Sequence, residues 1–184
     1  EIAAMTSLPT YDPAASRDLK SGPDYFINTA AMSIFEPAGL MYPLTFAMAI
    51  DNGTLKPDAK IDVGNGEWEY NGAKWTENLT GEMSVADALA KRSGIAAGKT
   101  GVMLGRATLH EYLTKFGFGG KVGNNTVYGE ETGIVRSTNH IDNVMISRIG
   151  LGSGVAVTGL QIANAYAALA NGGKSVSPHL IAKF

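Results

Sequence analysis

The sequence predicts a mixed domain of α-helices and β-strands, and three observations lead to this expectation. An apolar helix is expected to begin near Pro37, because proline fixes φ and loses no hydrogen bond in a first helical turn. Further helical patterns occur at 83–90, 109–116 and 162–171. Short strands are expected at Glu1–Ser7 and within 64–79, where glycines separate polar and aromatic pieces.

The helix after Pro37 is expected to be the central one. Apolar residues cover most of its circumference, which is typical of a buried helix. They are Leu40, Met41, Leu44, Phe46, Ala47 and Ile50. The small residues of Asp51–Gly53 then provide a helix exit.

Length and composition are consistent with one domain over 1–184 that has its own core. The chain is 45% hydrophobic, and its formal net charge of −2 gives no basic footprint for nucleic acid or for an anionic membrane surface. It has no apolar run of about 18 residues and no signal sequence at Glu1. We therefore expect membrane attachment only through a segment absent from this chain. It has no cysteine and no clustered metal ligands, so we expect no metal and no cofactor.

The N-terminal strand is expected because a short apolar run stops before Leu8-Pro9. It starts without a preceding turn, which suggests a hairpin partner upstream of the chain. It would also leave an open sheet edge through which self-association is possible. Residues 16–22 are expected to form a solvated connection.

Both tryptophans, Trp68 and Trp75, lie in the β-rich piece at 64–79. Paired tryptophans can form a platform on which a carbohydrate stacks. Two aromatic residues on one hairpin more often pack across the strands. We expect cross-strand packing here.

Three helices follow in the remainder of the chain. The helix Met83–Ala90 is expected to be capped by Thr80 or Ser84. Apolar residues spaced by three and four predict an amphipathic helix around 109–116. The last helix, at 162–171, has Thr158 as a candidate cap and Gly172 just after its end.

Three stretches resemble a known family in order and spacing. EPAGLMYP at 36–43 is similar to the Glu-Pro-Gly-Ser-x-x-Lys-Pro motif of the penicillin-binding transpeptidases, and KRSG at 91–94 is similar to their Lys-Ser-Ser-Asn. The stretch 150–173 is similar to their Gly-x-Gly-x-x-x-x-Thr-Pro-x-Gln helix, which ends in Ala-Asn-Gly-Gly. The whole chain, 1–184, thus resembles the transpeptidase domain of class B penicillin-binding proteins.

The resemblance implies an α/β (α+β) fold in which helices pack on a mainly antiparallel sheet, as in serine β-lactamases. It implies a bacterial, extracytoplasmic location, in the periplasm or on the outer face of the cytoplasmic membrane. It also implies binding of β-lactams and of peptidoglycan stem peptides, and partners among the proteins of cell-wall synthesis and cell division. Nucleic acid is not among the expected partners.

Four positions depart from the family's catalytic motifs. The family's chemistry needs a serine nucleophile and a lysine one helical turn later, and these positions hold Gly39 and Tyr42. Glycine has no side chain to acylate, and a tyrosine with a pKa of about 10 is a poor base at neutral pH. The second motif has Arg92 and Gly94 in place of its serine and asparagine. A guanidinium is always protonated and accepts no hydrogen bond.

Other residues keep family-like identities around this altered centre. The resemblance makes six of them candidates for lining the substrate cleft. They are Glu36, Ser93, Gly150, Gly152, Ser153 and Thr158. Tyr42 and Arg92 are expected to face the former cleft, where they fill it or make a cation–π contact.

The family's third motif, Lys-(Ser/Thr)-Gly, should follow Pro178 by some tens of residues, and the chain stops at Phe184. We therefore expect a domain that is incomplete at both ends. The triplet KTG at 99–101 lies in an alanine-rich stretch directly after the second motif, so we interpret it as a coincidence.

The leading hypothesis is a catalytically inactive pseudoenzyme that binds or scaffolds. One alternative is a fragment of an active D,D-transpeptidase whose remaining catalytic parts lie outside this chain. A more distant alternative is a phosphate-binding loop at 94–100, where Ser93 stands at the position of the first glycine and no strand precedes the loop. A displaced Ser-x-x-Lys pair does not occur, and His110, His140 and His179 are far apart.

Overall fold

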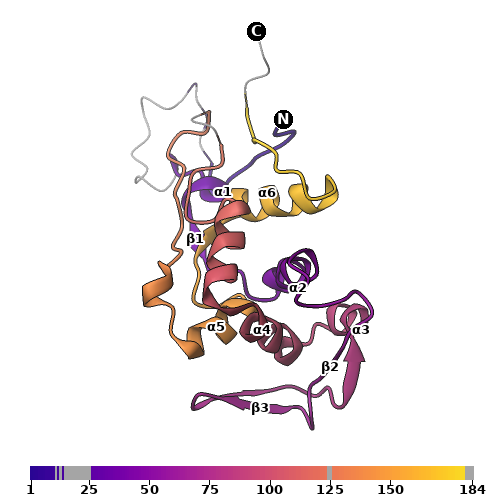
Figure 1. Ribbon diagram of the computed structural model, residues 1–184. Helices are drawn as coiled ribbons and strands as arrows, with labels where there is room; N and C mark the ends of the chain where they lie inside the picture. The colour runs from indigo at the N-terminus through magenta and orange to yellow at the C-terminus, as the bar shows by residue number, and fades with distance from the viewer. Residues whose placement is uncertain (11, 13, 15–25, 124–125, 181–184) are drawn as a thin grey trace. The chain divides into compact units, whose positions relative to one another are not determined.

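The computed structural model (Figure 1) describes residues 1–10, 12, 14, 26–123 and 126–180. The connection expected at 16–22 lies outside these residues. The chain forms two compact units. The first comprises Glu1–Phe35, Phe116–Gly133 and Val157–Phe184, and the second comprises Glu36–Lys115 and Ile134–Ala156. The expectation of a single domain stays a prediction.

The second unit contains most of the helices. They are the 3₁₀ helices η3 (Ala38–Met41) and η4 (Thr138–His140), and the α-helices α2 (Tyr42–Asp51), α3 (Val85–Ala90), α4 (Gly94–Lys115) and α5 (Asn143–Gly150). Helix α4 packs against α5 and α2 (Figure 1). Fully buried side chains of these helices, such as Met41, Leu44, Ile95 and Ile149, form the apolar interior of this unit.

The helix expected after Pro37 is confirmed. Pro37 caps η3, and α2 continues directly from it. Leu44 and Met48 are buried, whereas Leu40 is 45% exposed, so the apolar surface of this segment is not buried all round.

Helix α4 carries the predicted amphipathic pattern in its second half, where Leu109 and Leu113 are fully buried. Gly105, with φ 73° and ψ 167°, interrupts the helical backbone before that half. A side chain is strained at such a φ, which explains why glycine stands at the kink.

Two antiparallel strand pairs complete the second unit. Strand β2 (Lys60–Asp62) pairs with β5 (Glu82–Ser84), and β3 (Glu67–Tyr70) pairs with β4 (Ala73–Thr76). Asn71 and Gly72 both have positive φ in the two-residue turn between β3 and β4, which suits the twist of a hairpin. Trp68 lies opposite Trp75 with ring centroids 4.9 Å apart, so the predicted cross-strand packing is confirmed.

The prediction of a helix from Met83 is wrong for its first two residues. Met83 is a buried strand residue of β5 opposite Ile61, and the helix begins at Val85. Ser84 has an extended backbone, with ψ 160°, and its side chain accepts a hydrogen bond from the Asp87 amide. Ser84 is thus the cap, because its conformation ends the strand and satisfies an otherwise unpaired helical donor.

The first unit contains α1 (Thr29–Met32), β1 (Ile34–Phe35), β6 (Val157–Thr158) and α6 (Gly159–Ala170). Strands β1 and β6 pair antiparallel, with Ile34 opposite Thr158. The cap at Thr158 is confirmed, and its hydroxyl and the Gln161 side chain form a reciprocal capping box. Helix α6 therefore begins at Gly159, earlier than the sequence pattern indicates.

The strand expected at Glu1–Ser7 is not present. Within the described part of the chain, this segment makes one backbone–backbone hydrogen bond, from the Ile2 amide to the His179 carbonyl at 2.9 Å. The Ser7 hydroxyl instead accepts from the Thr29 amide at 2.9 Å, so a side chain fastens the segment in place of a ladder. Self-association through an open sheet edge stays a prediction.

A small core holds the first unit together. Ala31, Val127 and Leu160 are buried in it, and Ile2 and Met5 pack against them. Every described strand pair in both units is antiparallel, so the predicted class of helices with antiparallel sheet is confirmed. None of the described helices is both long and apolar enough to cross a membrane.

Candidate functional site

The residues that replace the first and second catalytic motifs lie together in the second unit. Gly39 lies in η3 at the start of α2, and Arg92 lies in the turn between α3 and α4. A Cβ atom built on Gly39 would lie 3.0 Å from the Arg92 Nη2 atom. The guanidinium therefore occupies the space that a serine side chain at position 39 would need.

Tyr42 and Gly94, the other two replaced residues, are arranged in the same way. A Cβ atom built on Gly94 would lie 3.1 Å from the Tyr42 hydroxyl oxygen and 3.0 Å from Leu151 Cδ2. Each long side chain that replaces a motif residue thus lies against the glycine of the other motif. The cation–π contact expected between Arg92 and Tyr42 is not found within the described residues, where the lysines Lys99 and Lys115 make such contacts.

Glu77, at the end of the β3–β4 hairpin segment, fixes the turn that carries Arg92. Its carboxylate accepts from the Ser93 hydroxyl at 2.6 Å and from the Ile95 amide at 3.1 Å. Ser93 is fully buried, and its oxygen accepts from the Ala96 amide at 3.1 Å. Ser93 therefore serves the start of α4, and its hydroxyl is not presented to solvent.

Tyr42 is a hydrogen-bond donor at neutral pH. Burial, followed by the negative charge of Glu77, raises the pKa of its phenol, and the positive charge of Arg92 opposes that rise. The hydroxyl consequently keeps its proton, and it cannot replace the family's lysine as a base.

A second cluster joins the start of α2 to the loop after α5. Glu36 accepts from the Ser153 hydroxyl at 3.0 Å and from the Gly154 amide at 2.8 Å. The Ala38 amide donates to the Gly152 carbonyl at 2.8 Å. A Cβ atom on Gly152 would lie 2.0 Å from the Ala38 carbonyl oxygen, so glycine is required at this close approach.

The six cleft candidates therefore separate by location. Glu36, Gly152 and Ser153 belong to this second cluster, and the Gly150 carbonyl accepts from the Thr45 hydroxyl at 3.0 Å nearby in the same unit. Ser93 belongs to the turn beside Arg92, whereas Thr158 caps α6 in the first unit. A role in substrate binding stays a prediction for all six.

Sequence reasoning missed Glu77. It follows the hairpin, sixteen positions before its partner Ser93, and local periodicity carries no signal of that contact. It also missed Gly101 in α4. A Cβ atom built on Gly101 would lie 3.0 Å from the Gly150 Cα atom. The small-residue positions at which α4 and α5 approach closely emerge only from the three-dimensional packing.

The phosphate-loop alternative is wrong. Residues 94–100 form the first turns of α4 rather than a loop, and α3 precedes them. Lys99 Nζ donates to the Asp62 carbonyl at 2.7 Å, and Thr100 donates to the Ala96 carbonyl of its own helix. The described residues also contain no group of three side chains arranged to hold a metal ion.

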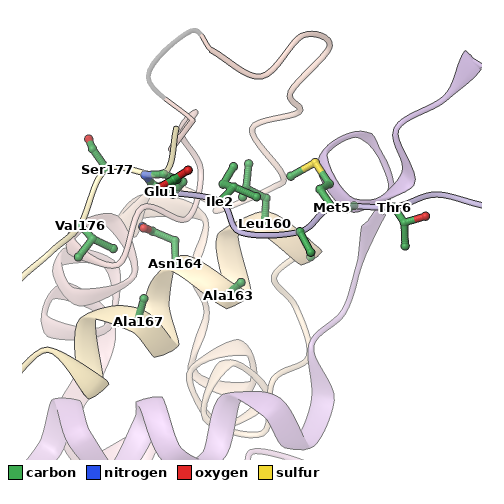
Figure 2. Close-up of a pocket in the computed structure, with 14 residues that line it drawn as sticks. Glu1, Ile2, Met5, Thr6, Leu160, Ala163, Asn164, Ala167, Val176 and Ser177 are labelled. Carbon is green, nitrogen blue, oxygen red and sulfur yellow. The ribbon is translucent and has the colours of Figure 1, made fainter. Parts of the chain in front are cut away.

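The first unit has an apolar groove of about 430 Å³ over α6 (Figure 2). Ile2, Met5, Leu160 and Ala163 contribute to its lining. Asn164 also lines it, and its buried Oδ1 atom has no hydrogen-bond partner among the described residues. None of the four replaced motif residues lies in this unit.

Comparison with known proteins relates the whole chain to one family. The model of the penicillin binding protein transpeptidase domain matches residues 1–184. Stage V sporulation protein D of Bacillus subtilis is 30% identical over 185 residues, which are 98% of this chain and 28% of that protein. Penicillin-binding protein PbpB of Mycolicibacterium smegmatis is 28% identical, again over 98% of this chain and 28% of the relative. The chain thus spans little more than a quarter of these relatives.

Solved structures show the same fold. The transpeptidase domain of Burkholderia pseudomallei penicillin-binding protein 3 superposes with a TM-score of 0.81 at 25% identity, over 87% of this chain and 48% of that one. A peptidoglycan glycosyltransferase from Burkholderia ambifaria gives a TM-score of 0.82 at 25% identity, over 88% and 51%. The fold is therefore that of a penicillin-binding transpeptidase domain, as predicted. This chain belongs to the penicillin-binding protein transpeptidase domain family.

Proposed function

We propose that this chain is a transpeptidase-like module of peptidoglycan synthesis that forms no acyl-enzyme and acts by binding. The observation that supports this most is the guanidinium of Arg92 against Gly39, 3.0 Å from a built Cβ atom. A covalent route needs a hydroxyl at that point and a base one turn away. The site offers a cation and a protonated phenol in their place.

No nearby group takes over the missing chemistry. Ser93 is buried, and its hydroxyl proton is engaged by Glu77. Tyr42 holds its proton because burial raises its pKa. An arginine guanidinium neither attacks a carbonyl nor accepts a proton. The family's nucleophile and base positions, Gly39 and Tyr42, therefore supply neither group, and Ser93 and Glu77 are engaged with each other and with the start of α4.

The surrounding frame supports a folded binding module. Relatives bear the names Stage V sporulation protein D and, in Escherichia coli, Peptidoglycan D,D-transpeptidase FtsI. That kinship supports a location outside the cytoplasm, beside proteins of cell-wall synthesis and division or on the stem peptides of peptidoglycan. Its ligands would be held without acylating the protein.

The test is incubation of the purified protein with a fluorescent penicillin, followed by denaturing electrophoresis and intact mass measurement. Only a covalent adduct survives denaturation. We expect an unlabelled band and an unchanged mass, beside a labelled band for PbpB of M. smegmatis as the positive control.

A labelled, mass-shifted chain would overturn the proposal. Mapping the modified residue would then identify the nucleophile and would favour the alternative of an active D,D-transpeptidase.

A further inference from the structure

Three aromatic side chains lie on one face of the β3–β4 hairpin. Side chains alternate between the two faces of a strand, so Trp68 and Tyr70 share a face, and Trp75 joins them from directly opposite Trp68. The Trp68 ring centroid lies 4.9 Å from that of Trp75 and 5.6 Å from that of Tyr70, and both pairs are stacked. These three residues form a continuous surface, which we call the aromatic stripe.

Trp68, which contacts both of the other rings, is anchored to the rest of the unit. A Cβ atom built on Gly98 in α4 would lie 2.8 Å from Trp68 Cζ3, so the indole packs closely on the helix where a side chain is missing. Lys99 Nζ lies 5.9 Å from the centroid of the same ring and donates to the Asp62 carbonyl. The aromatic stripe thus has a fixed support, and each of its three side chains stays partly exposed. A preorganised surface loses little conformational entropy when a ligand binds.

The charged side chains of the two strands lie on the opposite face of the hairpin. Glu67, Glu69 and Lys74 alternate with the aromatic residues and are exposed, and Lys74 pairs with Glu67 at 2.9 Å. The aromatic face therefore offers ring surface without a charged side chain from either strand. This surface suits a neutral ligand, whereas the excess of glutamate on the hairpin disfavours an anionic membrane surface.

The rings themselves indicate the chemical class of the ligand. Tyrosine and tryptophan combine an apolar ring face with a polar edge, where the hydroxyl or the indole N–H donates a hydrogen bond. A pyranose sugar has complementary surfaces, because its axial C–H groups form apolar patches and its hydroxyl groups lie around the edge. Several aromatic rings in a row match the successive sugars of a linear chain.

We propose that the aromatic stripe binds the sugar strand of peptidoglycan, a linear chain of β-linked N-acetylated pyranoses. Tyr70 and Trp75 stack on sugar rings, and Trp68 holds them in position. This inference rests on the proposed function, because it names the part of peptidoglycan that the module holds. Cross-strand packing is compatible with this role, since it orients the rings and leaves each partly exposed.

The test uses tryptophan fluorescence, because Trp68 and Trp75 are the two tryptophans of the chain. The purified protein is titrated with chitotetraose, a β-linked tetramer of N-acetylglucosamine. Maltotetraose, an α-linked glucose tetramer, is the control, because its curved chain does not lie flat along a row of rings. We expect a saturable change in emission with chitotetraose and binding of maltotetraose at least about tenfold weaker.

Substitutions test the two stacking rings. Trp75→Ala and Tyr70→Ala should each weaken chitotetraose binding about five- to tenfold, and Trp75→Phe should retain most of the affinity because it keeps a ring. Ligand-observed NMR measures the variants, since Trp75→Ala removes one of the two fluorophores. Tyr128→Ala, which removes an aromatic side chain that is 95% exposed in the first unit, should leave the affinity unchanged. Circular dichroism and unfolding curves confirm that each variant is folded.

The absence of a saturable response to chitotetraose would overturn this inference, as would equal binding of the two tetramers or an affinity unaffected by Trp75→Ala and Tyr70→Ala. A blue shift of the emission on vesicles of phosphatidylcholine and phosphatidylglycerol, without a response to chitotetraose, would assign the aromatic stripe to a membrane surface instead. These failures leave the proposed function intact, because stem peptides and protein partners remain as ligands. Covalent labelling by penicillin would refute the proposed function, whatever the result of the titration.

Discussion

The turns that carry the replaced motif residues differ from the helices around them in how well each residue suits its backbone. Helix α6 begins with a complete capping box at Thr158, and α4 meets α5 through Gly101 and Gly150, where a side chain would collide. By contrast, Ala38 and Arg92 adopt positive φ of 47° and 58°, a region that disfavours residues with a Cβ atom.

This difference distinguishes what the domain needs in order to fold from what acyl transfer needs. In the helices around these turns, which we call the frame, the helix ends are capped and glycines stand where backbones approach closely. A stable domain requires both features. The two turns hold the residues that we predict to correspond to the family's catalytic positions, and Ala38 and Arg92 are strained there. A module that binds needs the frame alone, whereas acyl transfer needs both.

The contact between α4 and α5 should be the most sensitive part of the frame. Gly150→Ala would place a Cβ atom 2.5 Å from the Ala97 carbonyl oxygen, a backbone atom that cannot rotate away. We expect a loss of about 2 kcal/mol in the free energy of unfolding, because overpacking outweighs the helix preference of alanine. Urea denaturation measures this loss. Gly120→Ala is the control, since its nearest atom would lie at 3.9 Å, and equal stability of both variants would contradict the proposed contact.

The cap of α6 should have the next largest effect. Thr158→Ala removes the hydroxyl that accepts from the Gln161 amide at 3.1 Å, and a buried donor loses its partner. We expect a loss of about 1 kcal/mol in thermal or urea unfolding. Thr158→Ser keeps the hydroxyl and should retain most of the stability. If Ser and Ala lower stability equally, the hydroxyl has no capping effect.

The strained turn should show a change of opposite sign. Arg92→Gly relieves the left-handed conformation, worth about 1–2 kcal/mol, against an entropy cost of about 0.5–1 kcal/mol for glycine. We expect a net gain of about 0.5 kcal/mol in the free energy of unfolding. Arg92→Ala removes the same guanidinium and keeps the strain, so it should not be stabilised. If both variants unfold with a higher free energy than the native protein, the gain comes from removal of the positive charge and not from relief of backbone strain.

Local signals predicted the elements whose causes lie within a few residues. Three predictions of this kind are confirmed by the structure: the helix start at Pro37, the cap at Thr158 and the cross-strand pair Trp68–Trp75. The prediction of an N-terminal strand was wrong because a strand forms only beside a partner strand. The composition of a segment does not show whether such a partner is present. The reciprocal filling of Gly39 by Arg92 and of Gly94 by Tyr42 joins residues about fifty positions apart. Such contacts depend on tertiary packing and leave no local pattern.

Tyr42 in the altered motif and Tyr112 in α4 both have a raised pKa, but the causes differ. Burial is the main cause of the raised Tyr42 pKa, whereas a 2.6 Å hydrogen bond to Asp51 raises the pKa of Tyr112 to about 12. Because the folded pKa of Tyr112 lies above its unfolded value of about 10, this bond stabilises the fold fully below pH 10, and the contribution is lost as the pH rises through about 12.

The Tyr112 contribution is small, since the pair lies at the surface and solvent screens it. We expect the native protein to lose more stability between pH 10 and 12 than Tyr112→Phe, measured by urea unfolding at each pH. Asp51→Asn should flatten the profile similarly, because it removes the charged acceptor. Lysines away from this pair contribute equally to all three profiles, and Lys115, whose Nζ lies 4.8 Å from the centroid of the Tyr112 ring, keeps an aromatic partner in Tyr112→Phe. Parallel profiles for the native protein and Tyr112→Phe would show that the hydrogen bond does not stabilise the fold, and the raised pKa would then need another cause.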